Sequence, residues 1–189
     1  MNASLRTVSG MTTPVRAPRA TLASCQARPD TAALAVMTDF NRTVPLTVAP
    51  EQQVDAALQD MIVGGVRALL VVEDGRLLGL VTANDLQGER PIQFQQSGFC
   101  DAYPCRHSDV HVGDVMTPLA KLTLLDQGAA ERSTVSDILT LMQLEGLTHL
   151  LVMQPDALGG REVHGLFSRT QLERALGDTA ATFLQRRAG

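Results

Sequence analysis

Aromatic residues, lysine and long hydrophobic runs are all scarce in this 189-residue chain. It has five Phe, one Tyr and no Trp, so its core must be aliphatic. The shortage also argues against a single-strand nucleic-acid binder, because such proteins stack bases on aromatic side chains. Lys121 is the only lysine, the net charge is −4, and no basic stripe is present to neutralise a phosphate backbone. We therefore expect no nucleic-acid partner.

The sequence also lacks the usual signatures of membrane proteins and enzymes. No stretch approaches the roughly 18 consecutive apolar residues of a membrane span. There is no phosphate-binding loop, no Gly-x-Gly-x-x-Gly after a strand, and no catalytic triad or pair of carboxylates in a supporting context. Three scattered cysteines (Cys25, Cys100 and Cys105) argue against a disulfide framework and favour a reducing compartment. These absences predict a cytoplasmic protein that is not an enzyme and does not enter a membrane.

Charge is unevenly distributed along the chain. Residues 1–29 carry four Arg and no acid, whereas the remainder carries twenty acids against twelve bases. The leader lacks the apolar segment of a secretory signal but has the composition of an organellar transit peptide. A disordered tail on a bacterial protein is the alternative, and the one we favour. The predicted organisation is a leader (1–29), a first repeat (30–88), a linker (89–111), a second repeat (112–177) and a C-terminal tail (178–189).

An internal repeat organises the chain after the leader. The first copy has a short strand at 44–48 and a helix at 51–63 whose apolar residues fall at positions 0, 3, 4, 7 and 8. A buried strand at 68–72 and a returning strand at 77–81 are joined by an Asp74-Gly75 hairpin turn. A short helix is predicted over residues 82–86.

The second copy repeats each of these pieces. Strands are predicted at 122–125, 150–153 and 163–167, with a helix at 134–145 and a final helix at 169–186. Gly65 and Gly146 follow the two long helices, where helices commonly end in a residue with left-handed backbone conformation. The predicted fold is α/β, with two pseudo-symmetric β-α-β-β-α units forming one module.

Three motifs occur in the same order as in a known family. They are Val-Met-Thr at 36–38 and again at 115–117, the strand and turn from Arg67 to Gly75, and Gly79-Leu-Val-Thr-Ala-Asn-Asp-Leu86. With these motifs, residues 34–88 and 112–177 resemble CBS (cystathionine-β-synthase) domains, which in tandem form a Bateman module. The resemblance implies a regulatory module, usually a homodimer without catalytic residues of its own. It also implies adenosine-containing ligands, such as AMP, ADP or ATP, in the clefts between paired repeats.

Thr82 and Asp85 are the first candidates for ligand binding. One carboxylate can accept hydrogen bonds from both hydroxyls of a ribose diol, and a hydroxyl three residues earlier can meet ribose or phosphate. The structural alternative is a helix N-cap with an acidic third position. In the second repeat, Ser168 and Gln171 occupy the equivalent positions, and Ser-x-x-Gln is a better capping box than ribose clamp. A second adenosine site is therefore in doubt, although Arg169 could still reach a phosphate.

Other candidates lie around the expected cleft. Arg67 could pair with a phosphate through its planar fork, or could be a solvated residue at a strand end. His149 is expected to be packed and hydrogen-bonded rather than a ligand. By resemblance, the segments around Thr38 and around Val44 and Pro45 would hold the adenine ring.

The linker contains a group of residues that the resemblance does not explain. Cys100, Cys105, His107 and His111 lie within twelve residues and could in principle close a tetrahedral zinc site. Their spacing is not one of the strong Cys-x2-Cys patterns, so we expect a plain linker and no metal.

Two functions therefore remain in view. The favoured one is a sensor that binds an adenosine ligand and relays its occupancy to an unidentified partner protein. The alternative is a structural or interaction module with vestigial clefts and a metal-holding linker.

Overall fold

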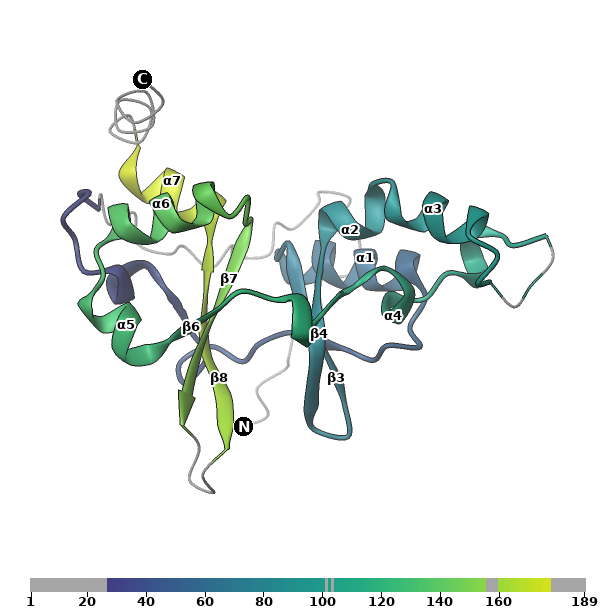
Figure 1. Ribbon diagram of the computed structural model, residues 1–189, viewed down its shortest axis with the longest axis horizontal. Coiled ribbons are helices and arrows are strands. Elements are labelled where there is room, and N and C mark those ends of the chain that lie inside the picture. Colours follow the sequence, from purple (N-terminus) through teal and green to yellow (C-terminus); the bar gives the residue numbers. More distant parts are fainter. Residues whose placement is uncertain (1–26, 101, 103, 156–159, 178–189) are drawn as a thin grey trace, which may run out of the picture.

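The computed structural model describes residues 27–100, 102, 104–155 and 160–177, and shows two similar halves side by side (Figure 1). Each half has a four-stranded sheet with its helices gathered on one face. The first half contains the strands β2 (Thr47–Val48), β3 (Ala68–Glu73) and β4 (Arg76–Thr82) and the helices α1 (Val54–Gly64) and α2 (Ala83–Gln87). The predicted α/β fold of two repeats is confirmed.

The second half repeats this order. Its elements are the strands β6 (Leu124–Asp126), β7 (His149–Pro155) and β8 (Arg161–Ser168) and the helices α5 (Gln127–Arg132), α6 (Val135–Leu144) and α7 (Arg169–Leu176). Helix α5 stands between β6 and α6, where the first half has no helix. Helix α7 is shorter than the predicted 169–186, because it ends before Gly177 at φ +54°, and the rest of that prediction lies outside the described residues.

The two halves exchange their first strands. Strand β1 (Thr38–Asp39) pairs with β8 of the second half, and β5 (Thr117–Pro118) pairs with β4 of the first half. The sheet orders are therefore β2-β3-β4-β5 and β1-β8-β7-β6. Each exchanged strand lies against a glycine: a Cβ on Gly79 would collide with the Thr117 carbonyl oxygen, and one on Gly165 would collide with that of Thr38. These glycines make room for the exchange.

Local sequence signals explain the regular parts of both halves. Asp74 and Gly75 both have positive φ, 49° and 74°, as the predicted hairpin turn between β3 and β4 requires. Gly65 and Gly146 both adopt φ 65° after the long helices. The predicted turn and both left-handed positions are confirmed.

Three hydrophobic clusters, mostly aliphatic, hold the molecule together. One lies between sheet and helices in each half, with Val54, Met61 and Val81 in the first and Ile138, Leu139 and Phe167 in the second. The third joins the two halves through Leu70, Leu80 and Leu151. Because Leu70 and Leu151 belong to β3 and β7, the two repeats pack through their central strands.

The segment between the repeats is more ordered than a plain linker. It forms the helix α3 (Arg90–Gln96) and a 3-10 turn (His107–Asp109), and leads into α4 (Val112–Val115). Pro91 and Val110 are buried, which fastens both ends of the segment to the first half. Among the described helices, none is long and apolar enough to cross a membrane.

Candidate functional site

The predicted cleft lies where the two repeats meet, at the ends of β4 and β8. Its lining comes from both halves: Arg67, Thr82, Ala83 and Asn84 from the first, and Thr148, His149 and Thr170 from the second. Its volume is about 70 Å³, well below the roughly 300 Å³ of an ordinary small-molecule pocket. The cleft in this structure is therefore smaller than a nucleotide-sized pocket.

Equivalent backbone contacts build the two sides of this cleft. The Ala83 amide donates to the Arg67 carbonyl at 2.9 Å, and the Arg169 amide donates to the Thr148 carbonyl at the same distance. These bonds place the start of each short helix beside the residue that precedes the neighbouring buried strand. The structure thus brings together Thr82, Arg67 and His149, all singled out from the sequence.

Thr82 and Asp85 form a complete capping box at the start of α2. The Thr82 amide and hydroxyl donate to Asp85 Oδ2 at 2.8 and 2.7 Å, and the Asp85 amide donates to Thr82 Oγ1 at 3.3 Å. The helix N-cap that the structural alternative predicted is therefore present. It leaves Oδ1 as the Asp85 oxygen not used by the cap.

That remaining oxygen contacts Arg90, a residue that the sequence analysis missed. Arg90 Nη1 lies 3.1 Å from Asp85 Oδ1, and it also donates to the Val115 carbonyl at 2.6 Å and to Thr117 Oγ1 at 3.1 Å. The Asp85 side chain is 14% exposed and that of Arg90 is 44% exposed. The sequence did contain a signal for Arg90. It is a basic residue five positions after Asp85, and it precedes Pro91 in the first turn of a helix.

The second repeat differs from what its sequence predicted. Within the described part of the chain, the Ser168 side chain makes no capping hydrogen bond, so the predicted Ser168–Gln171 capping box is wrong. Gln171 Oε1 instead accepts a hydrogen bond from Thr38 Oγ1 at 3.3 Å. The exchanged strand β1 brings Thr38 to this position and so gives Gln171 another partner. Arg169 pairs with Glu173 at 2.9 Å on its own helix.

The segments expected to hold an adenine ring are in different sheets. Thr38 belongs to β1, beside β8 and Gln171. Val44 and Pro45 precede β2, which pairs with β3 in the first sheet, and Val44 is 87% exposed. Because of the exchange, Thr117 rather than Thr38 belongs to the same sheet as the Thr82–Asp85 motif.

His149 lies inside the cleft as a neutral side chain. Burial, and after it the positive charge of Arg67, lower the pKa of His149 to about 4, while the nearby Asp85 acts in the opposite direction. Its Nδ1 lies 3.1 Å from Thr148 Oγ1. His149 therefore adds no positive charge to the cleft near neutral pH, and Arg67 is the cation available there to a phosphate.

The four Cys and His side chains of the linker have separate partners. Cys100 and Cys105 form a disulfide with Cα atoms 6.0 Å apart, which corrects the expectation that the cysteines are unpaired. The sequence did not predict this pair, because the two cysteines lie five residues apart with no recognised disulfide or metal-binding spacing. His107 Nε2 lies 3.1 Å from Asp55 Oδ1, and His111 Nδ1 lies 3.8 Å from Asp114 Oδ2. Over the described ranges, no three His, Cys, Asp or Glu side chains gather as a metal site.

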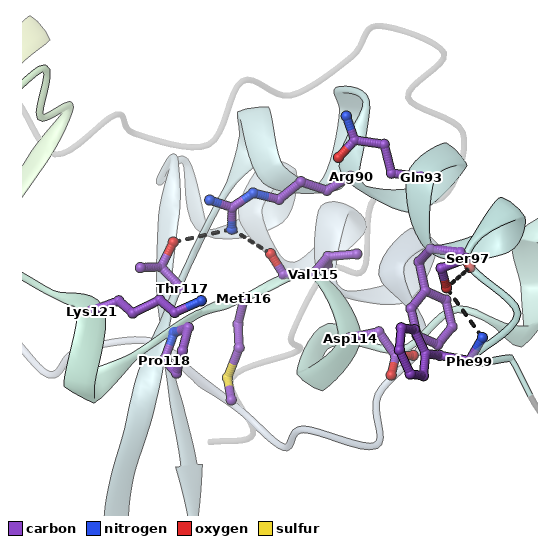
Figure 2. A pocket seen from close by; sticks show the side chains of 11 residues that line it. Arg90, Gln93, Ser97, Phe99, Asp114, Val115, Met116, Thr117, Pro118 and Lys121 are labelled. Carbon is purple, nitrogen blue, oxygen red and sulfur yellow. Dashed lines mark hydrogen bonds between the residues drawn. The ribbon is translucent and has the colours of Figure 1, made fainter.

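A larger hollow lies between α3 and the start of the second repeat (Figure 2). It has a volume of about 330 Å³. Arg90, Thr117 and Lys121 border one part of it, and Phe94, Phe99 and Met116 supply apolar surface. Arg90 thus stands between the hollow and Asp85.

Comparisons with known proteins agree with this architecture. Residues 36–90 match the CBS domain family. A search of curated proteins finds no match. Among solved structures, CBSX2 in complex with AMP is 25% identical with a TM-score of 0.53, covering 83% of this chain and 98% of its own. CBSX2 is a CBS-pair protein of Arabidopsis thaliana.

Two further structures support the fold alone. An uncharacterized conserved protein from Pyrococcus horikoshii is 21% identical with a TM-score of 0.53, and the match covers 78% of this chain and 92% of that one. A CBS domain protein from Thermoplasma acidophilum is 18% identical with a TM-score of 0.54, with coverage of 80% and 76%. The match to the CBS-pair protein CBSX2 covers 83% of this chain and so extends the likeness beyond residues 36–90.

Proposed function

From the premise that this chain is a CBS domain protein with the fold of a tandem CBS pair, we propose that it is a non-catalytic regulatory module that binds an adenosine-containing ligand. The ligand, of the class of AMP, ADP or ATP, occupies the cleft between the repeats beside Thr82 and Asp85. Its occupancy is relayed to a separate partner protein.

The position of the Thr82-Ala-Asn-Asp85 motif carries this proposal. Thr82 lines the inter-repeat cleft, and the carboxylate of Asp85 lies one helical turn behind it with a single oxygen free of the cap. A carboxylate there can accept hydrogen bonds from ribose hydroxyls, and Arg67 at the same cleft can pair with a phosphate. A CBS pair of similar fold, 25% identical to this chain, is known in complex with AMP.

We also propose that the module works as a homodimer. Val63 at the end of α1 and Leu144 at the end of α6 are 86% and 81% exposed, and Ile62 beside Val63 is 62% exposed. Apolar side chains at equivalent positions of both repeats form surface that a second copy would cover.

The experiment compares two variants that lose the same kind of helix cap. Asp85→Ala removes the α2 capping box, and Asp137→Ala removes a box of nearly identical geometry at α6, with Thr134. Calorimetric titration with AMP should show binding to wild type and to Asp137→Ala. Asp85→Ala should bind about 30- to 1000-fold more weakly, because a charge-assisted acceptor for the diol is lost. Equal binding of AMP by both variants would contradict the proposal that the ligand binds at Asp85.

A module with vestigial clefts is the second candidate, and two observations favour it. The cleft measures only about 70 Å³, and both Asp85 oxygens already have protein partners. Under this alternative, no adenosine compound raises the melting temperature. A ligand at 100 times its Kd should add about 2.7 kcal/mol of stability, so a thermal-shift panel of adenosine compounds separates the two candidates.

A further inference from the structure

The two carboxylate oxygens of Asp85 serve different purposes. Oδ2 accepts both hydrogen bonds from Thr82 and thereby holds the start of α2. Oδ1 takes no part in the cap and faces Arg90 Nη1 at 3.1 Å. A ribose hydroxyl arriving at Asp85 therefore meets the guanidinium of Arg90 at the oxygen that the helix does not need.

Arg90 is held at this place from outside the first repeat. It is the first residue of α3, in the segment between the repeats, and its Nη1 also donates to the Val115 carbonyl and to Thr117 Oγ1 (Figure 2). Val115 and Thr117 lead into and form the exchanged strand β5. One nitrogen thus ties the candidate ligand residue to the beginning of the second repeat.

Arg90 also has room to move. Its side chain is 44% exposed, and it borders the hollow of about 330 Å³ between α3 and β5. Asp85, by contrast, is 14% exposed and fixed by its cap. When a ligand competes for Oδ1, the arginine is therefore the partner that leaves.

We propose that Arg90 is an internal competitor of the ligand, a latch that must leave Asp85 Oδ1 before a ribose diol can bind. The inference rests on the proposed function. Only molecules in which Arg90 has left Asp85 can bind the ligand. The apparent affinity therefore equals the intrinsic affinity multiplied by the fraction of such molecules. Affinity is then set by the first residue of α3, so a change in how α3 is held also changes the affinity of the cleft.

The test is a calorimetric titration of the full chain with AMP, using variants of α3. Arg90→Met keeps an unbranched apolar side chain and removes the charge, and it should tighten AMP binding by about 3- to 30-fold. Arg90→Lys should fall between Arg90→Met and wild type, because it keeps the charge but loses the planar fork. Gln93→Ala lies on the same helix, borders the same hollow and does not contact Asp85, so it should bind AMP as wild type does.

A thermal melt separates the latch from ordinary damage to the fold. Arg90→Met should lower the melting temperature of the free protein, since bonds to Val115 and Thr117 are lost, while it raises the affinity for AMP. If wild type binds AMP and Arg90→Met binds it equally or more weakly, Arg90 is not a competitor, and the latch is overturned while the proposed function stands. If only Arg90→Met binds, the latch is supported. If neither binds at millimolar AMP, both proposals are overturned.

Discussion

The hydroxyl of Thr38 donates a hydrogen bond to Gln171, with 3.3 Å between Thr38 Oγ1 and Gln171 Oε1, and this bond joins the two repeats. Thr38 belongs to the first repeat by sequence, but the strand exchange places it on the sheet of the second. At the equivalent position of the other sheet, Thr117 accepts a hydrogen bond from Arg90. The two repeats thus share a backbone plan while their candidate ligand positions have different partners.

The Thr38–Gln171 pair should contribute to stability rather than to ligand binding. Gln171→Ala should lower the free energy of unfolding by about 0.5–1.5 kcal/mol, the usual net value of one such hydrogen bond. Thr38→Val should have a similar effect, and the double variant should cost less than the sum, because both changes remove the same bond. Urea denaturation of the four proteins measures this coupling. Strictly additive effects would show that the bond contributes nothing.

Local structure could be predicted from the sequence because local rules determine it. The positive φ angles at Asp74 and Gly75 follow from a two-residue hairpin, and the burial of Leu70 and Leu151 follows from continuous apolar strands. The partner of Thr38 did not follow, because the exchange depends on which half each first strand joins. Arg90 was missed for the same reason: its role depends on where α3 packs.

The roles of the helix-start motifs were also decided by long-range contacts. Ser168-x-x-Gln171 has the better capping sequence, yet the complete box forms at Thr82-x-x-Asp85. The Asp85 carboxylate accepts the bonds of the cap on one oxygen and forms an ion pair with Arg90 through the other, whereas the single amide oxygen of Gln171 bonds to Thr38. Spacing alone did not show which partner each acceptor would have.

The difference between the two repeats predicts the stoichiometry of binding. Gln171 has one acceptor oxygen and no charge, and that oxygen already bonds to Thr38, so it offers no clamp for a ribose diol. AMP should therefore bind with about one equivalent per chain, beside Asp85. Calorimetry with an independently determined protein concentration measures this number. Two equal sites per chain would contradict the asymmetry.

His149 should make the protein less stable in mild acid. Its pKa is about 4 in the folded chain and near 6.5 when unfolded, so the unfolded state binds the proton more tightly. The stabilisation is fully present above pH 6.5 and is lost progressively as the pH falls to 4, at a total cost of about 1–3 kcal/mol. Unfolding of wild type and His149→Gln between pH 7 and 4 should show a smaller loss in the variant. Parallel curves would indicate that His149 titrates normally.

Val63 and Leu144 occupy equivalent positions at the ends of α1 and α6. Both are more than four-fifths exposed, and the bulk of neither side chain is needed to fill a cluster within the chain. If these helix ends form the dimer interface, Val63→Glu combined with Leu144→Glu should place uncompensated charges there and produce monomers at micromolar concentration. Sedimentation velocity measures the change. Ile92→Glu is the control, because Ile92 is an apolar residue 53% exposed on a different helix, α3, and should leave the dimer intact. A wild-type chain that sediments as a monomer would contradict the proposed homodimer, and a double variant that remains dimeric would place the interface elsewhere.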